Sequence, residues 1–250
     1  MKSFYIRLLN VIFGLFLYAL GIVVTIKANI GYAPWDVFHV GIANKTGLTI
    51  GTVSILVGLL IVIIVTLFRE KFGLGTILNM LLIGLFLDVV FPYIPEAQNF
   101  IFGIVMLIAG LFIISVGSYF YIKSAFGAGP RDNLMVVLAR RTRLPVGLCR
   151  FAVELFATVT GWFLGGMVGI GTVISVIAIG FCIQITFKIF KFNVTAVKHE
   201  TLKDTYLTLK KKKLTKNYQI SIFLRSFQFQ CGRQGAKWQR LLSYVPGKVR

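Results

Sequence analysis

The sequence predicts an all-α protein, a multi-pass membrane helix bundle with six spanning helices. Three observations predict it: the composition, the length of the apolar runs and an internal repeat. Of the 250 residues, 57% are hydrophobic and only 14% are charged, and the mean hydropathy is +0.83. A soluble domain is about 45–50% apolar and about 25% charged. The excess of apolar side chains therefore needs lipid as its solvent.

Six apolar runs are long enough to cross a bilayer, which takes about 20 residues. No small-residue cleavage site follows the first run, which favours a retained helix over a signal peptide. The spans are predicted near 8–26, 50–68, 74–94, 99–122, 146–164 and 168–188.

Two longer connections, 27–49 and 123–145, break this pattern of spans and short joints. Each begins with Lys, contains a Gly-x-x-Pro turn and continues for about a dozen residues of mixed polarity. Such stretches are too short to span as helices. They predict one re-entrant or interfacial helix each, with Pro34 and Pro130 at the first helical position.

The net charge of +19 is unevenly distributed along the chain. Residues 1–191 carry 14 Lys/Arg and 6 Asp/Glu, whereas residues 192–250 carry 13 and 2. A basic tail after a membrane helix favours a cytoplasmic anchor on anionic lipid over nucleic-acid binding. The Lys/Arg bias of the loops likewise predicts that both termini are cytoplasmic, in a bacterial cell membrane. The tail has neither helical nor strand periodicity beyond about 213, and we expect it to be poorly ordered.

An internal repeat appears when the chain is shifted by 96 residues. Aligning 14–91 with 110–187 gives 22 identities in 78 positions, where composition alone gives roughly six. Each unit holds three spans, an odd number, so the second must enter the membrane from the opposite side. The sequence thus predicts two inverted repeats, 1–95 and 99–191, followed by the tail 192–250. Inverted repeats recur in secondary transporters; the alternative is that duplication only built a stable bundle.

The repeat carries paired motifs. A Lys-x-x-x-Gly-x-x-Pro-x-Asp pattern occurs at 27–36 and again at 123–132, and Gly-x-Gly-Thr opens the third span of each unit. The predicted structural glycines and prolines of these motifs are Gly31, Pro34, Gly75, Gly127, Pro130 and Gly171. Asp36 and Asp132 fall in the first turn of the short helices, where the dipole favours a carboxylate. They are either helix caps or parts of two pseudo-symmetric gating elements.

Polar side chains also occur within the spans. Arg150 and Glu154 are four residues apart on one helix face and can pair. An ionisable residue near mid-membrane is a functional hypothesis, although a structural ion pair is the alternative. Asn79 and Asp88 have polar counterparts in the second repeat, which indicates either a polar interior or hydrogen bonds between helices.

Catalytic, metal-binding and cofactor motifs are missing from the sequence. It contains no His-Glu-x-x-His, Gly-x-Ser-x-Gly or Walker pattern, and its three cysteines form no CxxC pair. We therefore expect no enzyme activity, no metal and no cofactor. The leading hypothesis is a small-solute transporter or permease; the alternative is a non-transporting scaffold or assembly factor that binds a partner at its basic cytoplasmic face. The candidate pathway residues are Trp35, Asp36, Asn79, Asp88, Arg131, Asp132, Arg150 and Glu154.

Roles follow from the charges of these residues. Arg131 and Arg150 are candidates for binding an anionic group, and Glu154 is a candidate proton carrier. The sequence names neither a substrate nor an oligomeric state.

Four segments carry a resemblance to a known family. They are TIKANIGYAPWDVFHVG at 25–41, GTILNMLLIG at 75–84, GAGPRD at 127–132 and VGIGT at 168–172. In this order they resemble the bacterial YczE/YyaS/YitT membrane protein family, over roughly residues 1–205. The resemblance implies a bacterial cytoplasmic-membrane protein without an assigned biochemical activity. It supplies no catalytic residues, so the site hypotheses depend on the chemistry of the residues themselves.

Overall fold

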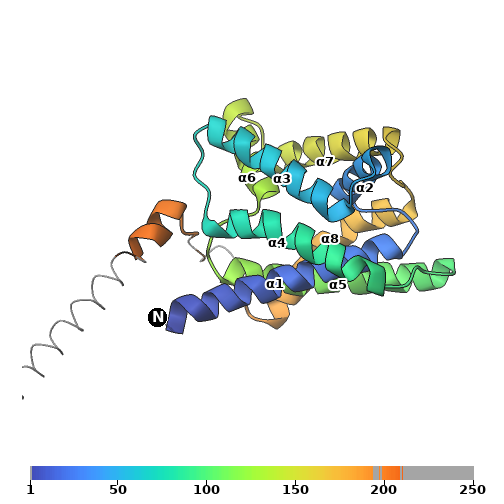
Figure 1. The fold of residues 1–250 in the computed structure, drawn as a ribbon, viewed down its shortest axis with the longest axis horizontal. Coiled ribbons are helices and arrows are strands. Elements are labelled where there is room, and N and C mark those ends of the chain that lie inside the picture. Colours follow the sequence, from blue (N-terminus) through green and yellow to red (C-terminus); the bar gives the residue numbers. More distant parts are fainter. Residues whose placement is uncertain (1, 194–196, 198, 209, 211–250) are drawn as a thin grey trace, which may run out of the picture. The chain divides into compact units, whose positions relative to one another are not determined.

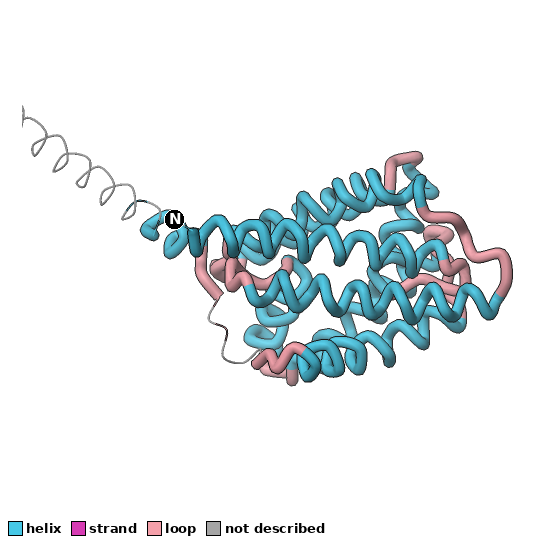
Figure 2. The backbone as a smooth tube through the Cα atoms, turned by 90° about the horizontal axis from the view of Figure 1, so that it is seen from below, coloured by secondary structure: helices cyan, strands magenta, loops and turns pink. Residues whose placement is uncertain are grey.

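The computed structural model describes residues 2–193, 197, 199–208 and 210, and these residues form helices joined by loops without any strand (Figures 1 and 2). The predicted all-α class is confirmed. The chain divides into two compact units, residues 1–205 and 206–250. In the second unit, residues 206–208 and 210 are helical; the tail beyond 210, predicted to be poorly ordered, lies outside the described residues.

The described part of the first unit contains eight complete α-helices and one short 3₁₀ helix, and residues 202–205 are also helical. Six α-helices are long and apolar enough to cross a membrane, and they lie within a few residues of the predicted spans. The elements are α1 (Lys2–Lys27), α2 (Pro34–Thr46), α3 (Ile50–Leu67), α4 (Leu74–Val90), η1 (Phe91–Tyr93), α5 (Phe100–Lys123), α6 (Pro130–Thr142), α7 (Val146–Phe163) and α8 (Ile170–Ile189).

Two pairs of corresponding helices in the two halves of the chain begin and end 96 residues apart. The shift is 96 residues at both ends for α2 and α6, and again for α3 and α7. The loops that precede α2 and α6 also share their backbone conformation. Asn29 and Ala125 have positive φ angles of 54° and 59°, and Gly31 and Gly127 have 116° and 127°. Glycine suits the latter pair because side chains clash at such angles.

The helices pack in two layers, visible in Figure 1. The first, here the core layer, consists of α1, α4, α5 and α8; α1 packs on α5 and α4, and α5 packs on α8. The second, here the short-helix layer, consists of α2, α3, α6 and α7; α2 packs on α7, and α3 packs on α6. The layers meet along α3 and α4, whereas α7 does not pack along α8.

Glycines allow the two central helices of the core layer to approach each other closely. A Cβ atom added to Gly14 would lie 2.8 Å from the carbonyl oxygen of Gly117, and one on Gly21 would lie 2.7 Å from that of Gly110. Because the order of the partners reverses, α1 and α5 run antiparallel. Small residues favour association in lipid, where helices gain little from the hydrophobic effect.

Backbone hydrogen bonds between the halves fix the short helices. The N–H of Gly75, in the first turn of α4, donates to the carbonyl oxygen of Phe126 at 2.8 Å, and that of Gly171, in α8, donates to Ile30 at the same distance. Both acceptors lie in the loops that lead into α6 and α2. Each half therefore holds the short helix of the other half in place.

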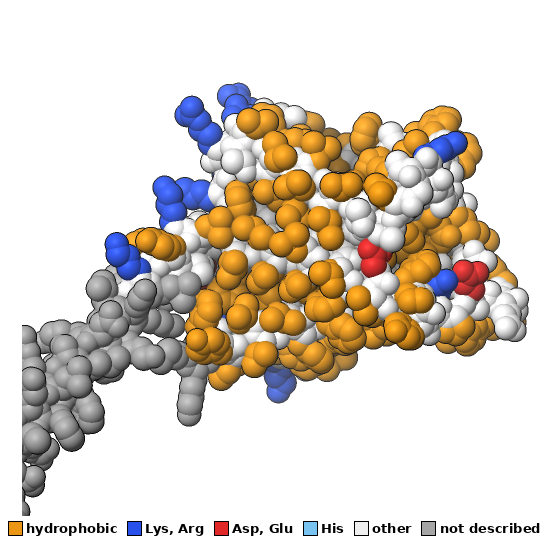
Figure 3. Space-filling view, in the orientation of Figure 1, with side chains coloured by type: hydrophobic (Ala, Val, Ile, Leu, Met, Phe, Trp, Pro, Cys, Tyr) orange, Lys and Arg blue, Asp and Glu red, His pale blue; other side chains and the backbone are white. Residues whose placement is uncertain are grey.

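Charged residues mark the two ends of the bundle differently. At one end, Arg7 pairs with Glu200 at 2.7 Å and Arg140 pairs with Glu70 at 2.5 Å. Most of the described Lys and Arg side chains gather there, as Figure 3 shows for one face. We call this the basic end. At the opposite end, Lys27 pairs with Glu96 at 3.0 Å.

The first prediction concerns the α1–α5 crossing. We expect Gly21→Val to lower stability by about 1–3 kcal/mol, because the added atoms collide with backbone and force the helices apart. Gly180→Val is the matched control, since a Cβ at Gly180 meets no other atom within 4 Å. The measurement is the midpoint of thermal unfolding of the detergent-purified protein; equal shifts for the two variants would contradict the assignment.

Candidate functional site

A polar cavity lies between the two layers. Its larger part has a volume of about 290 Å³ and is lined by both layers, including Asn79, Arg131 and Asp132. A smaller part of about 100 Å³ adjoins it and is lined by Asp36 and Ser175 among others. Arg131 and Arg150 line both parts, which we together call the central cavity.

The two parts of the central cavity correspond to each other through the 96-residue shift. The N-terminal turn of α6, with Pro130 and Asp132, faces the larger part beside Asn79. The N-terminal turn of α2, with Asp36, faces the smaller part beside Ser175. The cavity is therefore built by the same elements of both halves, and both short helices direct their N-termini, which favour negative charge, toward it.

All ionisable Asp, Glu, Arg and His side chains of the cavity come from the short-helix layer. The core layer supplies neutral polar groups instead, the hydroxyls of Tyr18, Ser118 and Tyr121 and the amide of Asn79 among them. The charged and imidazole side chains of the short-helix layer that line the cavity are Asp36, His39, Arg131, Asp132, Arg150 and Glu154.

Arg131 lies at the middle of this arrangement. Its guanidinium carbon is 4.6 Å from the centre of the Trp35 ring, a cation–π distance. Its Nη2 atom is 3.5 Å from Nε2 of His39. Among the described residues, no carboxylate lies within ion-pairing distance of its guanidinium, so its remaining donors can serve a ligand.

Asp36 and Asp132 occupy equivalent positions but differ in their surroundings. Asp36 is only 5% exposed, and its carboxylate has no hydrogen-bond or ion-pair partner among the described residues. Burial raises the pKa of Asp36, and the Arg131 guanidinium partly offsets that rise. Asp132 is open to the cavity. Desolvation by the surrounding protein raises the pKa of Asp132, while Arg150, Arg131 and the N–H of Gly129 oppose the rise. Of the two predicted roles, helix cap or gating element, the role of a cap suits Asp132 better than Asp36.

Arg150 and Glu154 form an ion pair on α7, with Nε 2.9 Å from Oε1. The Glu154 side chain is 18% exposed and the Arg150 side chain 52%. The predicted i, i+4 pairing is thus present, and both residues of the pair line the central cavity.

Two buried hydrogen-bond donors at the cavity lack a partner within the described part of the chain. They are the indole N–H of Trp35 and the hydroxyl of Ser175. Both residues line the smaller part of the cavity. An unsatisfied buried polar group is costly, so a bound solute or water that accepts these hydrogen bonds would stabilise this region.

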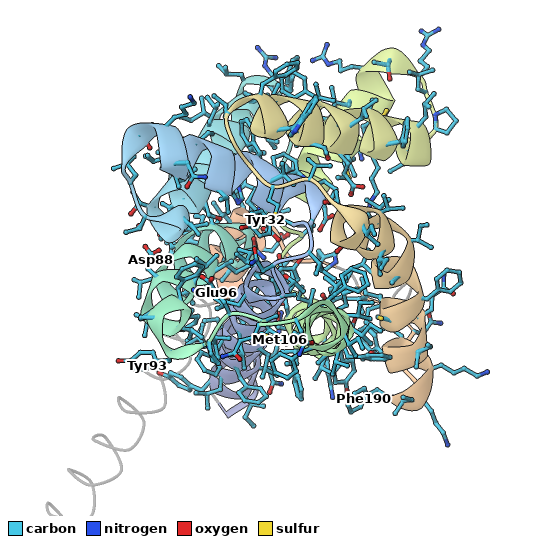
Figure 4. The ribbon with its side chains drawn as sticks, turned by 90° about the vertical axis from the view of Figure 1, so that its right-hand side faces the viewer. Tyr32, Asp88, Tyr93, Glu96, Met106 and Phe190 are labelled. Atoms are coloured by element: carbon cyan, nitrogen blue, oxygen red, sulfur yellow. The ribbon has the colours of Figure 1, made fainter. Side chains whose placement is uncertain are left out.

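Seven of the eight predicted pathway residues line the central cavity. The exception is Asp88, which lies where α4 meets the start of α3 (Figure 4). The predicted structural residues also have clear positions: Pro34 and Pro130 begin α2 and α6. The sequence did not single out Tyr18 or His39, because an isolated aromatic or histidine in an apolar segment carries no periodic or motif signal.

No metal site is evident, since no three His, Cys, Asp or Glu side chains come together in the described residues. The central cavity instead offers a mixture of cationic, anionic and hydroxyl groups. Such a mixture can bind and orient a small polar solute.

Comparison with known proteins agrees with this membrane architecture. Residues 5–188 match the model of a family of unknown function, DUF6198. The chain is 35% identical to the uncharacterised membrane protein YczE of Bacillus subtilis over 173 residues, which are 68% of this chain and 80% of that protein. It is 31% identical to an uncharacterised protein of Haemophilus influenzae over 69% of this chain and 79% of the relative. It is 25% identical to YyaS of B. subtilis over 65% and 83%.

No solved structure matches the chain. The match to the family model covers most of the chain and runs from α1 to the end of α8. The chain therefore belongs to the DUF6198 family, and it is a relative of YczE and YyaS of B. subtilis.

Proposed function

We propose that this protein carries a small polar solute across the cell membrane by alternating access, through movement of the short-helix layer against the core layer. The observation that carries this proposal is the central cavity between the layers. Charged side chains in a membrane protein are expensive and commonly mark a substrate or ion pathway. Here they converge on one cavity instead of being distributed among the helix contacts.

The relation between the halves supports the same proposal. We infer that they form an inverted-topology repeat, with three spans each and with the second half entering the membrane from the opposite side. The antiparallel crossing of α1 and α5 supports this inference. In transporters built this way, the substrate site lies near the midplane between the repeats, which is where a cavity lined equivalently by both halves would lie.

The cavity's chemistry favours a solute that carries an anionic group. Arg131 has unpaired donors, and the N-termini of α2 and α6 add the positive ends of two helix dipoles. A carboxylate or phosphate group would accept hydrogen bonds from this set and from Ser175. Asp36 is better suited than Glu154 to carry a coupled proton, because Glu154 is already paired with Arg150.

The alternative, a scaffold or assembly factor, would be favoured by a dry, close-packed interface between the layers. A polar cavity that reaches Glu154 favours transport instead. The basic end of the bundle is the face that we assign to the cytoplasm, because cytoplasmic loops carry the excess of Lys and Arg. Both termini are then cytoplasmic.

The second prediction tests transport directly. Full-length protein is reconstituted in liposomes and incubated with a uniformly ¹³C-labelled extract of bacterial small metabolites, and the lumen is analysed by mass spectrometry. We expect at least one labelled anionic metabolite to enter roughly tenfold faster than into empty liposomes, and Arg131→Gln to abolish the difference. Arg143→Gln, at the exposed basic end, is the control. If no labelled metabolite enters with correctly folded wild-type protein, the proposal fails.

The third prediction separates function from stability at the Arg150–Glu154 pair. Because the pair is partly exposed, Arg150→Ala and Glu154→Gln should each change the free energy of unfolding by no more than about 1 kcal/mol. We expect both to lower uptake of the same metabolite by roughly tenfold. Arg140→Gln breaks an ion pair at the basic end, outside the cavity, and should leave uptake unchanged. Unchanged uptake in both α7 variants would remove this pair from the pathway.

A further inference from the structure

The two layers are held together at the start of α3 by a close contact with α4. Gly51 of α3 packs against Gly84 of α4, and a Cβ atom on Gly84 would lie only 2.5 Å from the carbonyl oxygen of Gly51. Asp88, one turn further along α4, accepts hydrogen bonds from the N–H of Gly51 at 2.8 Å and from the hydroxyl of Thr49 at 2.6 Å. We call this contact the α3–α4 gate.

The equivalent contact in the second half is open. The residues 96 positions later are Gly147 on α7 and Gly180 on α8, and a Cβ atom at either would meet no other atom within 4 Å. Both glycines are exposed, as is Gln184, which corresponds to Asp88. The same two helices that pack in the first half are therefore apart in the second.

The two positions lie at opposite ends of the bundle. Arg140, near the end of α6, pairs with Glu70, which follows α3. The start of α7 comes only a few residues after α6, so Gly147 lies at the basic end, where α3 ends. Gly51 is at the start of α3 and lies at the other end. Glycines bring α3 and α4 together at one end of the bundle, and the corresponding helices α7 and α8 are separated at the other end.

The glycines at the open position have no role in the conformation seen here. Glycine in an exposed helix costs about 0.5–1 kcal/mol relative to alanine, and neither Gly147 nor Gly180 makes a close contact that would require it. A second conformation in which these glycines touch, as Gly51 and Gly84 do here, gives both of them a function.

We infer that Gly147 and Gly180 form a second gate, which closes when the α3–α4 gate opens and so turns the central cavity toward the opposite end. This inference rests on the proposed function, since it describes how the layers alternate. In the second conformation α7 packs on α8, and the side-chain oxygen of Gln184 accepts the N–H of Gly147 as Asp88 accepts that of Gly51.

The two gates differ in chemistry, which sets the balance between the conformations. Asp88 offers a charged acceptor to the N-terminus of α3, where the helix dipole adds to the attraction, and Thr49 adds a second hydrogen bond. In the second gate, Gln184 is neutral and Pro145 stands in the place of Thr49. The α3–α4 gate is therefore the stronger one, and the conformation with this gate closed is the resting state.

The fourth prediction tests the two gates by distance measurement. The three native cysteines of the full chain are replaced, and nitroxide labels are attached in nanodiscs to cysteines at Leu48 and Val89 or at Leu144 and Ile185. These four side chains are exposed, and the second pair is the first shifted by 96 residues. Double electron–electron resonance then reports the separation across each gate. We expect each pair to show a short and a long distance, with the long one dominant at Leu144/Ile185.

Each substitution should change the separations of the two label pairs together, so that one becomes shorter as the other becomes longer. Asp88→Asn should raise the population with a short Leu144/Ile185 distance by roughly tenfold, as expected for the loss of a charge-assisted hydrogen bond. Gly180→Leu should remove that population, and with it the long Leu48/Val89 distance. Gly84→Leu is the matched variant in the first half. It should remove the population with a short Leu48/Val89 distance, and with it the long Leu144/Ile185 distance.

The outcomes separate the gate from the transport proposal. A single long Leu144/Ile185 distance that Asp88→Asn leaves unchanged would overturn the second gate, even if labelled metabolites still enter proteoliposomes. Coupled distance changes without uptake of any metabolite would support the gates and contradict transport. If Gly84→Leu fails to fold, Asp88→Asn and Gly180→Leu still decide the result.

Discussion

The antiparallel crossing of α1 and α5 is the contact on which the rest of the structure depends. Hydrophobic side chains gain nothing by leaving lipid for a helix surface that is equally apolar, so association in a bilayer depends on close packing. Four glycines at a spacing of seven residues provide it by letting the two backbones touch. Once α1 and α5 cross, α4 and α8 have surfaces to pack on, and the core layer is complete.

The short-helix layer cannot be as tightly joined to this core, because it carries the charged side chains. Its contacts with the core layer include the hydrogen bonds at Gly75 and Gly171 and the packing of α3 along α4. Charged groups buried between two apolar layers would be costly without water or partners. The central cavity meets that requirement, because the charged side chains lie there beside neutral polar groups of the core layer.

Most of the fold could be predicted from the sequence, because the signals that predict it are local or periodic. Apolar run length gave the six spans, and Gly-x-x-Pro turns gave α2 and α6 with Pro34 and Pro130 at their first positions. The composition of the site was also largely predictable, since ionisable residues in apolar segments are rare. The position of Asp88 at a helix contact was not, because a polar residue on a spanning helix faces either a cavity or a neighbour, and periodicity does not distinguish the two.

The division into two layers was equally inaccessible to the sequence, because it depends on which faces of similarly apolar helices meet. The repeat predicts two equivalent halves, and the helix boundaries and loop angles show an equivalent backbone.

Yet a strictly symmetric molecule would have no reason to favour either end. The departures from the repeat are therefore as informative as the identities. Trp35 corresponds to Arg131, and Ser54 to Arg150, so the charge of the cavity is supplied mainly by the second half. Asp88 corresponds to Gln184, so the strongest contact between the layers forms in the first. On a repeated backbone, these unequal side chains give the two halves of the protein different chemistry.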